Sequence, residues 1–210
     1  MITAAKPKAV VFDLGGVIVA LGPATDIVGD RFRAEQEFWP RWLMSAAVRD
    51  FEGGRTTAAQ FGERFVAEFE LAMPGDELVE RFRSWPQGLF EGAEALLTEL
   101  ARNDDLEIAA LSNSNPLHWH EQRDAHKIRA LFDRAFLSYE LGVVKPDRAI
   151  FDAVTSALDV RPDEILFFDD NQLNVDGARA AGWTAVLAQG PGPCRAHLAS
   201  LGLVTSDQGT

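Results

Sequence analysis

Cysteine is almost absent from this sequence of 210 residues, in which Cys194 is the only one. A single cysteine cannot form an internal disulfide, and this scarcity is typical of proteins that work in a reducing compartment. Residues 1–8 contain no apolar stretch like that of a secretory signal, and no apolar run is long enough to cross a bilayer. We therefore expect a cytoplasmic protein that has no membrane partner.

Positive charge is also scarce, since 20 Lys and Arg residues are set against 32 Asp and Glu residues, for a formal net charge of −12. Nucleic acids and anionic membranes are bound through clustered Lys and Arg, so this balance argues against both partners. It does not exclude a small anionic substrate, because a metal ion or a few local cations can reverse the field within one cleft. The composition is compatible with a monomer or a homodimer.

Short apolar segments that end in polar residues recur along the chain and predict an α/β fold. The first is residues 9–12, which run directly into Asp13 and are closed by Gly15 and Gly16. Similar segments follow at residues 106–111, 135–138, 165–168 and 184–188. Helical segments separate them, and this alternation is typical of a doubly wound, Rossmann-like parallel sheet with helices on both faces.

The stretch between residues 25 and 85 is different, because its apolar residues recur at helical spacing and no strand is evident. The residues that carry this pattern are Phe32, Phe38, Trp39, Trp42, Leu43, Phe61, Phe65 and Phe69. We expect a small helical domain at residues 22–87, packed over the carboxyl edge of the sheet. The core domain would then comprise residues 1–21 and 88–204, followed by a flexible tail at 205–210.

Polar side chains stand where the core strands end or the next helix begins. They are Asp13, Ser112, Asn113, Lys145, Asp169 and Asp170. Because the carboxyl ends of parallel strands meet at one edge of a sheet, we expect these side chains to converge there. Two carboxylates about 4 Å apart repel by roughly 4 kcal/mol at an effective dielectric near 20, so the three aspartates require a cation.

The chemistry of this set fits phosphoryl transfer. Hard oxygen ligands at an open site suit Mg²⁺, which keeps water molecules that a phosphate can replace. Lys145, the Ser112 hydroxyl and the turn amides can hold the charge of that phosphate. One carboxylate in line with the phosphorus can then act as a nucleophile and form an acyl-phosphate.

Four motifs, in this order, resemble those of the haloacid dehalogenase-like (HAD) hydrolase superfamily. They are Phe-Asp-Leu-Gly-Gly-Val at 12–17, Leu-Ser-Asn-Ser at 111–114, Val-Lys-Pro-Asp at 144–147 and Phe-Phe-Asp-Asp-Asn at 167–171. The resemblance extends over residues 10–190, and it implies that the helical insert is the cap domain of that superfamily. Each motif ends a predicted strand or opens a predicted helix, which makes the set far more specific than any one motif.

The resemblance implies a metal site made by the first and last motifs. Asp13 would be both the nucleophile and a metal ligand, and the carbonyl of Gly15 would be a backbone ligand. Asp170 would hold Mg²⁺, and Asp169 would support the metal or its waters.

The two middle motifs would hold the substrate. Ser112 and Asn113 would contact the phosphoryl group, and Lys145 would balance its charge. The resemblance thus implies a hydrolase that acts on a small phosphorylated metabolite, with a sugar phosphate as the favoured substrate.

The chain departs from the commonest pattern of the superfamily at Gly15, where most phosphatases carry a second aspartate as general acid and base. A general acid is typically worth about 10²–10⁴-fold in rate. Three interpretations stay open: a leaving group that needs little protonation, a proton from Asp169 or a metal-bound water, or a crippled site. Sugar 1-phosphate phosphatases of the superfamily resemble this chain and also have glycine here, so Gly15 alone does not indicate inactivity.

Two alternatives to a phosphatase also stay open. A 2-haloacid dehalogenase would use Asp13 without a metal, but the Asp169–Asp170 pair would then be a costly uncompensated charge. A non-catalytic binding protein could keep the same fold, although it would not need an in-line nucleophile. A phosphonate hydrolase is excluded because it needs a cap lysine for Schiff-base chemistry. The lysines of this chain are Lys6, Lys8, Lys127 and Lys145, all outside residues 22–87.

Aromatic and histidine side chains outside the motifs have simpler interpretations. The aromatic residues of the helical stretch should form its own core, with one or two facing the cleft to stack on a sugar. His118, His120 and His126 lack the spacing of a zinc site and fit a helix with one packed histidine.

Overall fold

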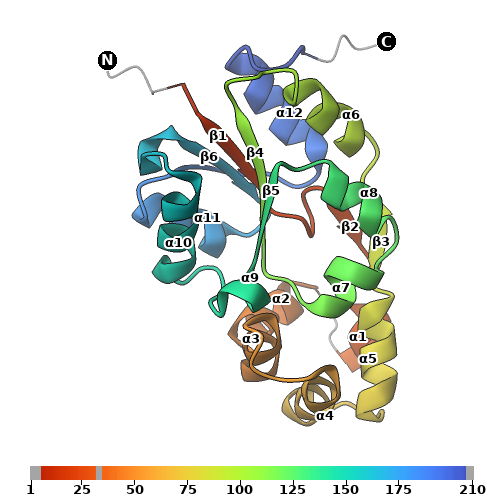
Figure 1. The fold of residues 1–210 in the computed structure, drawn as a ribbon. Coiled ribbons are helices and arrows are strands. Elements are labelled where there is room, and N and C mark those ends of the chain that lie inside the picture. The colour runs from red at the N-terminus through yellow and green to blue at the C-terminus, as the bar shows by residue number, and fades with distance from the viewer. Residues whose placement is uncertain (1–5, 32–34, 207–210) are drawn as a thin grey trace.

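The computed structural model describes residues 6–31 and 35–206, so the expectations for Phe32 and for tail residues 207–210 lie outside the described residues. A five-stranded parallel sheet forms the centre of the fold, in the order β5-β4-β1-β6-β7 (Figure 1). Its strands are β1 (Ala9–Phe12), β4 (Glu107–Ser112), β5 (Arg134–Leu137), β6 (Ile165–Asp169) and β7 (Thr184–Leu187). The predicted α/β fold with a doubly wound parallel sheet is confirmed.

Strand β1 lies at the centre of the sheet because both of its faces are apolar. Val10 and Phe12 pack into one buried cluster, and Ala9 and Val11 pack into the cluster on the opposite face. Burial on both faces explains why this strand is a continuous apolar run rather than an alternating one. The first cluster lies under α6 (Ala93–Leu100) and α12 (Pro191–Ser200), and the second under α10 (Arg148–Leu158) and α11 (Gln172–Ala180).

Short helices complete the core between the strands. They are α7 (Pro116–Glu121), α8 (Ala125–Ala130), α9 (Ser138–Leu141) and the 3₁₀ turn η2 (Pro162–Glu164). Cys194 of α12 is fully buried in the apolar core, where a free cysteine packs as a small apolar side chain.

The helices between residues 25 and 83 form a separate group beyond the sheet, here called the helical unit (Figure 1). They are α1 (Thr25–Val28), η1 (Gly29–Arg31), α2 (Glu35–Met44), α3 (Ala46–Glu52), α4 (Ala58–Phe69) and α5 (Gly75–Arg83). Their apolar faces surround one aromatic-rich cluster of their own. Thr57 begins α4 with a capping box to Gln60, and the Ser45 hydroxyl accepts a hydrogen bond from Val48 N–H at the start of α3.

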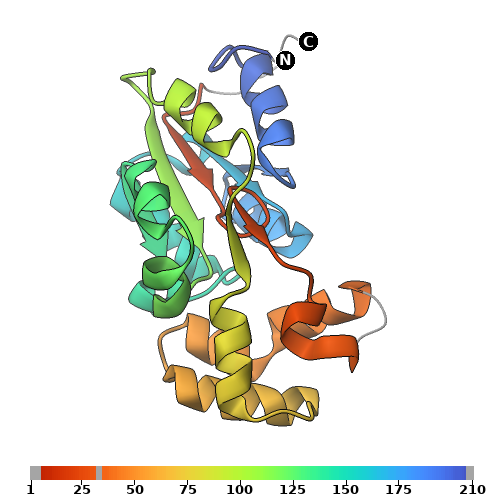
Figure 2. The ribbon, with the colours of Figure 1, turned by 90° about the vertical axis from the view of Figure 1, so that its right-hand side faces the viewer.

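A two-stranded antiparallel ribbon joins the helical unit to the core, as Figure 2 shows. The ribbon pairs β2 (Val19–Leu21) with β3 (Pro86–Leu89). The sequence did not predict a strand at β3, because proline and glycine are depleted in strands. Pairing with β2 determines the conformation of β3, which spans the position where we placed the boundary between the two domains.

The carboxyl edge of the sheet faces the helical unit (Figure 1). Side chains from both parts line one cleft. Among the described residues, no helix has both the length and the apolar character needed to cross a bilayer.

Candidate active site

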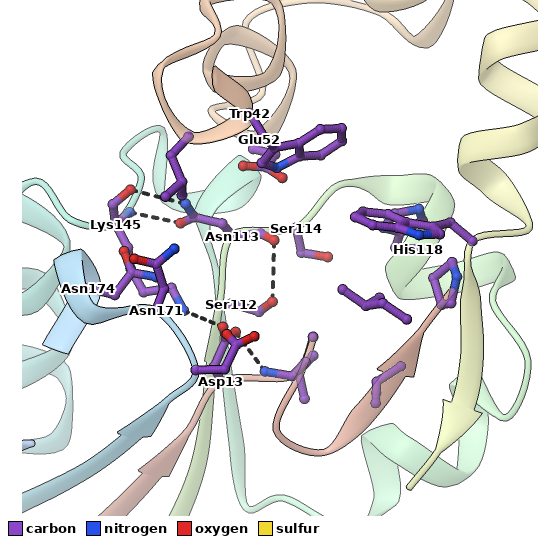
Figure 3. A pocket seen from close by; sticks show the side chains of 18 of the residues that line it. Asp13, Trp42, Glu52, Ser112, Asn113, Ser114, His118, Lys145, Asn171 and Asn174 are labelled. Carbon is purple, nitrogen blue, oxygen red and sulfur yellow. Dashed lines mark hydrogen bonds and ion pairs between the residues drawn. The ribbon is translucent and has the colours of Figure 1, made fainter. Parts of the chain in front are cut away.

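The polar residues at the strand ends meet in one cleft of about 410 Å³ beneath the helical unit (Figure 3). Asp13, Ser112, Asn113, Lys145 and Asp170 all line this cleft. Asp169 lies beside them and is completely buried. The structure therefore brings together all four motifs that the sequence placed at this edge.

Asp13 follows β1 directly and is fixed by bonds to the main chain and to a lysine. Its N–H donates to the carbonyl of Phe168 at 2.8 Å, which continues the pairing of β1 with β6. The N–H of Leu14 donates to Asp13 Oδ1 at 2.7 Å, and Lys145 Nζ lies 3.0 Å from Oδ2. The carboxylate is thus held in one orientation at the floor of the cleft.

Lys145 is deeply buried in the site, with only 1% of the residue exposed. Its ammonium contacts Asp169 Oδ2 at 2.6 Å and Asp13 Oδ2 at 3.0 Å, and it donates to the Leu111 carbonyl at 3.1 Å. Burial alone would lower the pKa of Lys145, but the two carboxylates raise it above its ordinary value. Lys145 is therefore a permanently charged group.

Three carboxylates share this single ammonium. One oxygen of each of Asp13, Asp169 and Asp170 lies within 4.8 Å of the others. Burial, and to a lesser extent the other two carboxylates, raises the pKa of Asp13 well above its usual range although Lys145 opposes this. Burial in the cleft and the charge of Asp169 raise the pKa of Asp170 to about 6. The site therefore has excess negative charge, which a bound cation would relieve.

The two residues of the acidic pair have different surroundings. Asp169 accepts hydrogen bonds from Asn171 N–H at 2.8 Å and from the Asn174 amide at 3.0 and 3.2 Å, in addition to Lys145. Among the described residues, no side chain donates a hydrogen bond to the Asp170 carboxylate, which lines the cleft. Asp170 lies so close to Gly16, at φ +77°, that a Cβ on Gly16 would overlap its carboxylate. Glycine at this position thus allows Asp170 to approach the loop after β1.

The donor set fits a magnesium ion. Asp13 and Asp170 offer carboxylate oxygens beside the loop that contains Gly15, and none of the described residues donates a hydrogen bond to the Gly15 carbonyl. Carboxylate and carbonyl oxygens are the ligands that this hard cation prefers, and a cleft open to solvent leaves room for its waters.

Ser112 ends β4 and Asn113 follows it, and their side chains have different partners. Among the described residues, the only hydrogen-bond partner of the Ser112 hydroxyl is the Asn113 carbonyl at 3.4 Å, so this hydroxyl is available to a ligand. The Asn113 amide is engaged at both ends, because it accepts from Lys145 N–H at 2.8 Å and donates to the Lys145 carbonyl at 3.1 Å. The Asn113 side chain thus fixes the backbone of Lys145, a role that sequence reasoning missed.

The helical unit covers the cleft with large aromatic side chains. Trp39, Trp42, Phe82 and Trp85 line it, and each belongs to a network of ring contacts within the unit. His118 lies beside them, and burial lowers its pKa to about 4. The neutral ring uses Nε2–H to donate to the Phe82 carbonyl at 2.7 Å, which leaves Nδ1 as an acceptor.

Glu52 is a cleft residue that sequence reasoning missed. It ends α3 and is only 8% exposed, and it lines the same cleft as Asp13. Burial raises the pKa of Glu52 to about 8, although Lys145 and Arg49 act in the opposite direction. Nothing in the sequence distinguishes it from a surface acid, because only the packing of the helical unit on the core buries it.

The sequence model of the family described as haloacid dehalogenase-like hydrolase matches residues 7–182 of this chain. The chain belongs to the haloacid dehalogenase-like hydrolases. The family and the enzyme class predicted from the four motifs are thereby confirmed.

Relatives of this HAD-like hydrolase that match over most of both chains are named phosphatases. Phosphatase MT3486 of Mycobacterium tuberculosis is 29% identical, with 96% of this chain and 98% of the relative covered. D-ribitol-5-phosphate phosphatase of Bacteroides thetaiotaomicron is 28% identical, with coverage of 84% and 89%. These relatives support hydrolysis of phosphate monoesters.

Solved structures show the same fold in a HAD family enzyme that binds magnesium and phosphate and in a dehalogenase. A HAD family enzyme of Bacteroides thetaiotaomicron, in complex with magnesium and inorganic phosphate, gives a TM-score of 0.67 at 24% identity and covers 87% of this chain and 94% of that one. L-2-haloacid dehalogenase of Xanthobacter autotrophicus gives a TM-score of 0.63 at 21% identity, with coverage of 95% and 85%. The fold therefore does not decide between phosphatase and dehalogenase chemistry.

Proposed function

We propose that this HAD-like hydrolase is a Mg²⁺-dependent phosphatase that cleaves a small phosphorylated metabolite through an aspartyl-phosphate intermediate. The observation that carries the proposal is the position of Asp13. Its oriented carboxylate lies between the buried Lys145 ammonium and the acidic pair, at the floor of a cleft. This arrangement suits a nucleophile that approaches a charged phosphoryl group.

Asp13 would attack the phosphorus, and water would then hydrolyse the aspartyl-phosphate and restore the carboxylate. Lys145 would stabilise the charge on the phosphoryl oxygens. The Ser112 hydroxyl would donate to one of these oxygens. Asn113 would contact the same group through its main chain while its side chain positions Lys145.

Asp13, the Gly15 carbonyl and Asp170 would hold Mg²⁺, with Asp169 as support for the site. When bound, Mg²⁺ neutralises negative charge and polarises a phosphoryl oxygen as a Lewis acid. The acidic pair is the reason to prefer this function over a metal-free dehalogenase, because a cation offsets its repulsion.

Residues 22–87 would act as a cap over the core formed by residues 1–21 and 88–204, with 205–210 as a tail. The cap would exclude water and select the organic part of the substrate. The aromatic side chains Trp39, Trp42 and Trp85 support a substrate with a flat apolar face, and a sugar phosphate is our first candidate.

Phosphate release from a panel of sugar phosphates and an aryl phosphate, with Mg²⁺ or with EDTA, tests the proposal. We expect Mg²⁺-dependent release that Asp13→Asn abolishes and that the control Asp176→Asn retains, because Asp176 is exposed and bonded to Gln172. No release by the wild type, or equal release by Asp13→Asn, would refute the proposal. Halide release from 2-chloropropionate would instead support a dehalogenase.

A further inference from the structure

The position two residues after the nucleophile cannot supply a proton in this chain. Gly15 has no side chain, and a Cβ there would lie 3.2 Å from Leu21 Cδ1. Leu21 thus occupies the space into which a longer side chain would extend. Under the proposed function, the oxygen of an ordinary alcohol leaving group still needs a proton, so another group must provide it.

Most titratable groups of the cleft are unsuited to this task. Asp169 is saturated by Lys145, Asn171 and Asn174. Asp170 belongs to the acidic cluster on the Asp13 side of the cleft. The only ring proton of neutral His118 is donated to the Phe82 carbonyl.

Glu52, unlike the other titratable groups of the cleft, has a carboxyl that is buried and without a bonding partner among the described residues. The residue is only 8% exposed. Within the part of the chain that the structure describes, no hydrogen-bond donor or cation lies within bonding distance of its carboxyl. Its main chain is anchored, because the Ser138 hydroxyl donates to its carbonyl at 2.6 Å and the next N–H, of Gly53, caps α3. A buried carboxyl without a partner is expensive to ionise, so it is stable as the neutral acid.

Glu52 and Asp13 lie on opposite sides of the cleft, on the helical unit and on the core respectively (Figure 3). In an in-line displacement the leaving oxygen departs from the phosphorus on the side opposite the nucleophile. The leaving oxygen of a substrate attacked by Asp13 therefore points toward the helical unit. We propose that Glu52 is the general acid that protonates this oxygen, and this assignment rests on the proposed phosphatase function.

In the proposed reaction Glu52 gives up a proton in the first step and takes one back in the second. In the first step, the bond from Asp13 to phosphorus forms and the bond from phosphorus to the leaving oxygen breaks. The leaving oxygen takes that electron pair and the Glu52 proton, and the alcohol departs. In the second step, water attacks from the vacated side and gives its proton to the Glu52 carboxylate, which releases phosphate and restores both residues.

The protonation state of Glu52 agrees with this role, because burial raises its pKa to about 8. The charged groups that act on it are Lys145 and Arg49, and Arg49 is itself paired with Asp147 at 2.8 Å. Titratable side chains of the helices packed against α3 are exposed or bonded elsewhere. Those that the structure describes are Glu37, Arg41, Glu63, Arg64, Glu68, Tyr139 and Glu140.

The test compares wild type and Glu52→Gln on phosphate esters that differ in the acidity of their leaving group. We expect kcat/KM of Glu52→Gln to fall by about 10²–10⁴-fold on an alkyl phosphate, the usual worth of a general acid. On an aryl phosphate with an acidic phenol the loss should stay below about tenfold, because that leaving group departs without a proton. The control Glu63→Gln removes an exposed carboxylate from α4 and should change neither value.

The pH profile gives a second readout that a purely structural role would not change. For the alkyl phosphate, kcat/KM of the wild type should decline as the pH rises through about 8, because Glu52 must carry its proton. This decline should be absent in Glu52→Gln. If Glu52→Gln lowered kcat/KM equally on both esters, or if its kcat/KM still declined above about pH 8, the assignment of Glu52 would be overturned. Inactivity of the wild type on every ester would instead refute the proposed function itself.

Discussion

At the scale of single residues, the site is organised by one buried ammonium. Lys145 separates Asp13 from Asp169 and is held in turn by the Leu111 carbonyl and the side chain of Asn113. Removal of one partner from a buried ionic cluster leaves charges with neither water nor a counterion. The stability of the fold and the chemistry of the site therefore depend on the same side chain.

We expect Lys145→Met to lower the free energy of unfolding by about 3–5 kcal/mol at pH 8, because two buried carboxylates lose their counterion. The loss should be smaller at pH 5, where these carboxylates can take up protons in the variant. Urea unfolding of the wild type and the variant at both pH values measures this difference in the free energy of unfolding. The control Lys127→Met removes an exposed pair with Glu94 and should cost less than about 1 kcal/mol, and equal losses in both variants would contradict the argument.

At the scale of elements, two close backbone approaches set the shape of the helical unit and its fit to the core. Gly62 of α4 meets the carbonyl of Gly75 at the start of α5, where a Cβ would overlap it. Gly54, at φ +69°, lies equally close to the Tyr139 carbonyl of α9. The first contact lets α4 and α5 pack tightly, and the second places the end of α3, and with it Glu52, over the cleft.

We expect Gly62→Ala to lower the free energy of unfolding by about 1–3 kcal/mol, because the added methyl must push two helix backbones apart. The helix propensity of alanine, which exceeds that of glycine by roughly 1 kcal/mol, offsets only part of this cost. Thermal and urea unfolding measure the change. Ala67→Ser on the exposed face of α4 should stay within about 0.5 kcal/mol, and a Gly62→Ala protein more stable than wild type would show that the helices can separate freely.

At the scale of the whole molecule, the chain crosses between core and helical unit through the β2–β3 ribbon (Figure 2). Side chains from both parts line the cleft. Arg49 of α3 reaches Asp147 of the core at 2.8 Å, and Arg83 of α5 is paired with Glu121 of α7. Such exposed pairs contribute little each, so they guide the docking of the two parts rather than fix it.

We expect Mg²⁺ to stabilise the whole protein, because a ligand that binds only the folded state adds about 2.7 kcal/mol at a hundredfold excess over its Kd. The unfolding temperature should rise with Mg²⁺ over EDTA in the wild type. Asp170→Asn, which removes a carboxylate of the acidic cluster, should lose most of this rise, and Asp176→Asn should keep it. A rise of the same size in Asp170→Asn would place the ion elsewhere.

The sequence by itself determined the sheet and the residues at its edge. Each core strand is an apolar run that ends in a polar motif, and the carboxyl ends of parallel strands lie on the same side of a sheet. The sequence alone therefore predicted the convergence of Asp13, Ser112, Lys145 and the acidic pair. The sequence did not predict strand β3, because its Pro-Gln-Gly-Leu sequence becomes extended only by pairing with β2.

Only the tertiary structure decided which side chains outside the four motifs reach the cleft, and which of them are protonated there. Glu52, Trp39 and Trp42 come from helices of the helical unit, whose sequence predicts an apolar face but not its orientation toward the sheet. His118 comes from the core helix α7, and the packing of the helical unit on the core buries it. Burial raises the pKa of Glu52 and lowers that of His118, and burial arises from contacts between segments far apart in the chain. Local sequence sets which groups are available, whereas long-range packing removes their water and so sets their charge.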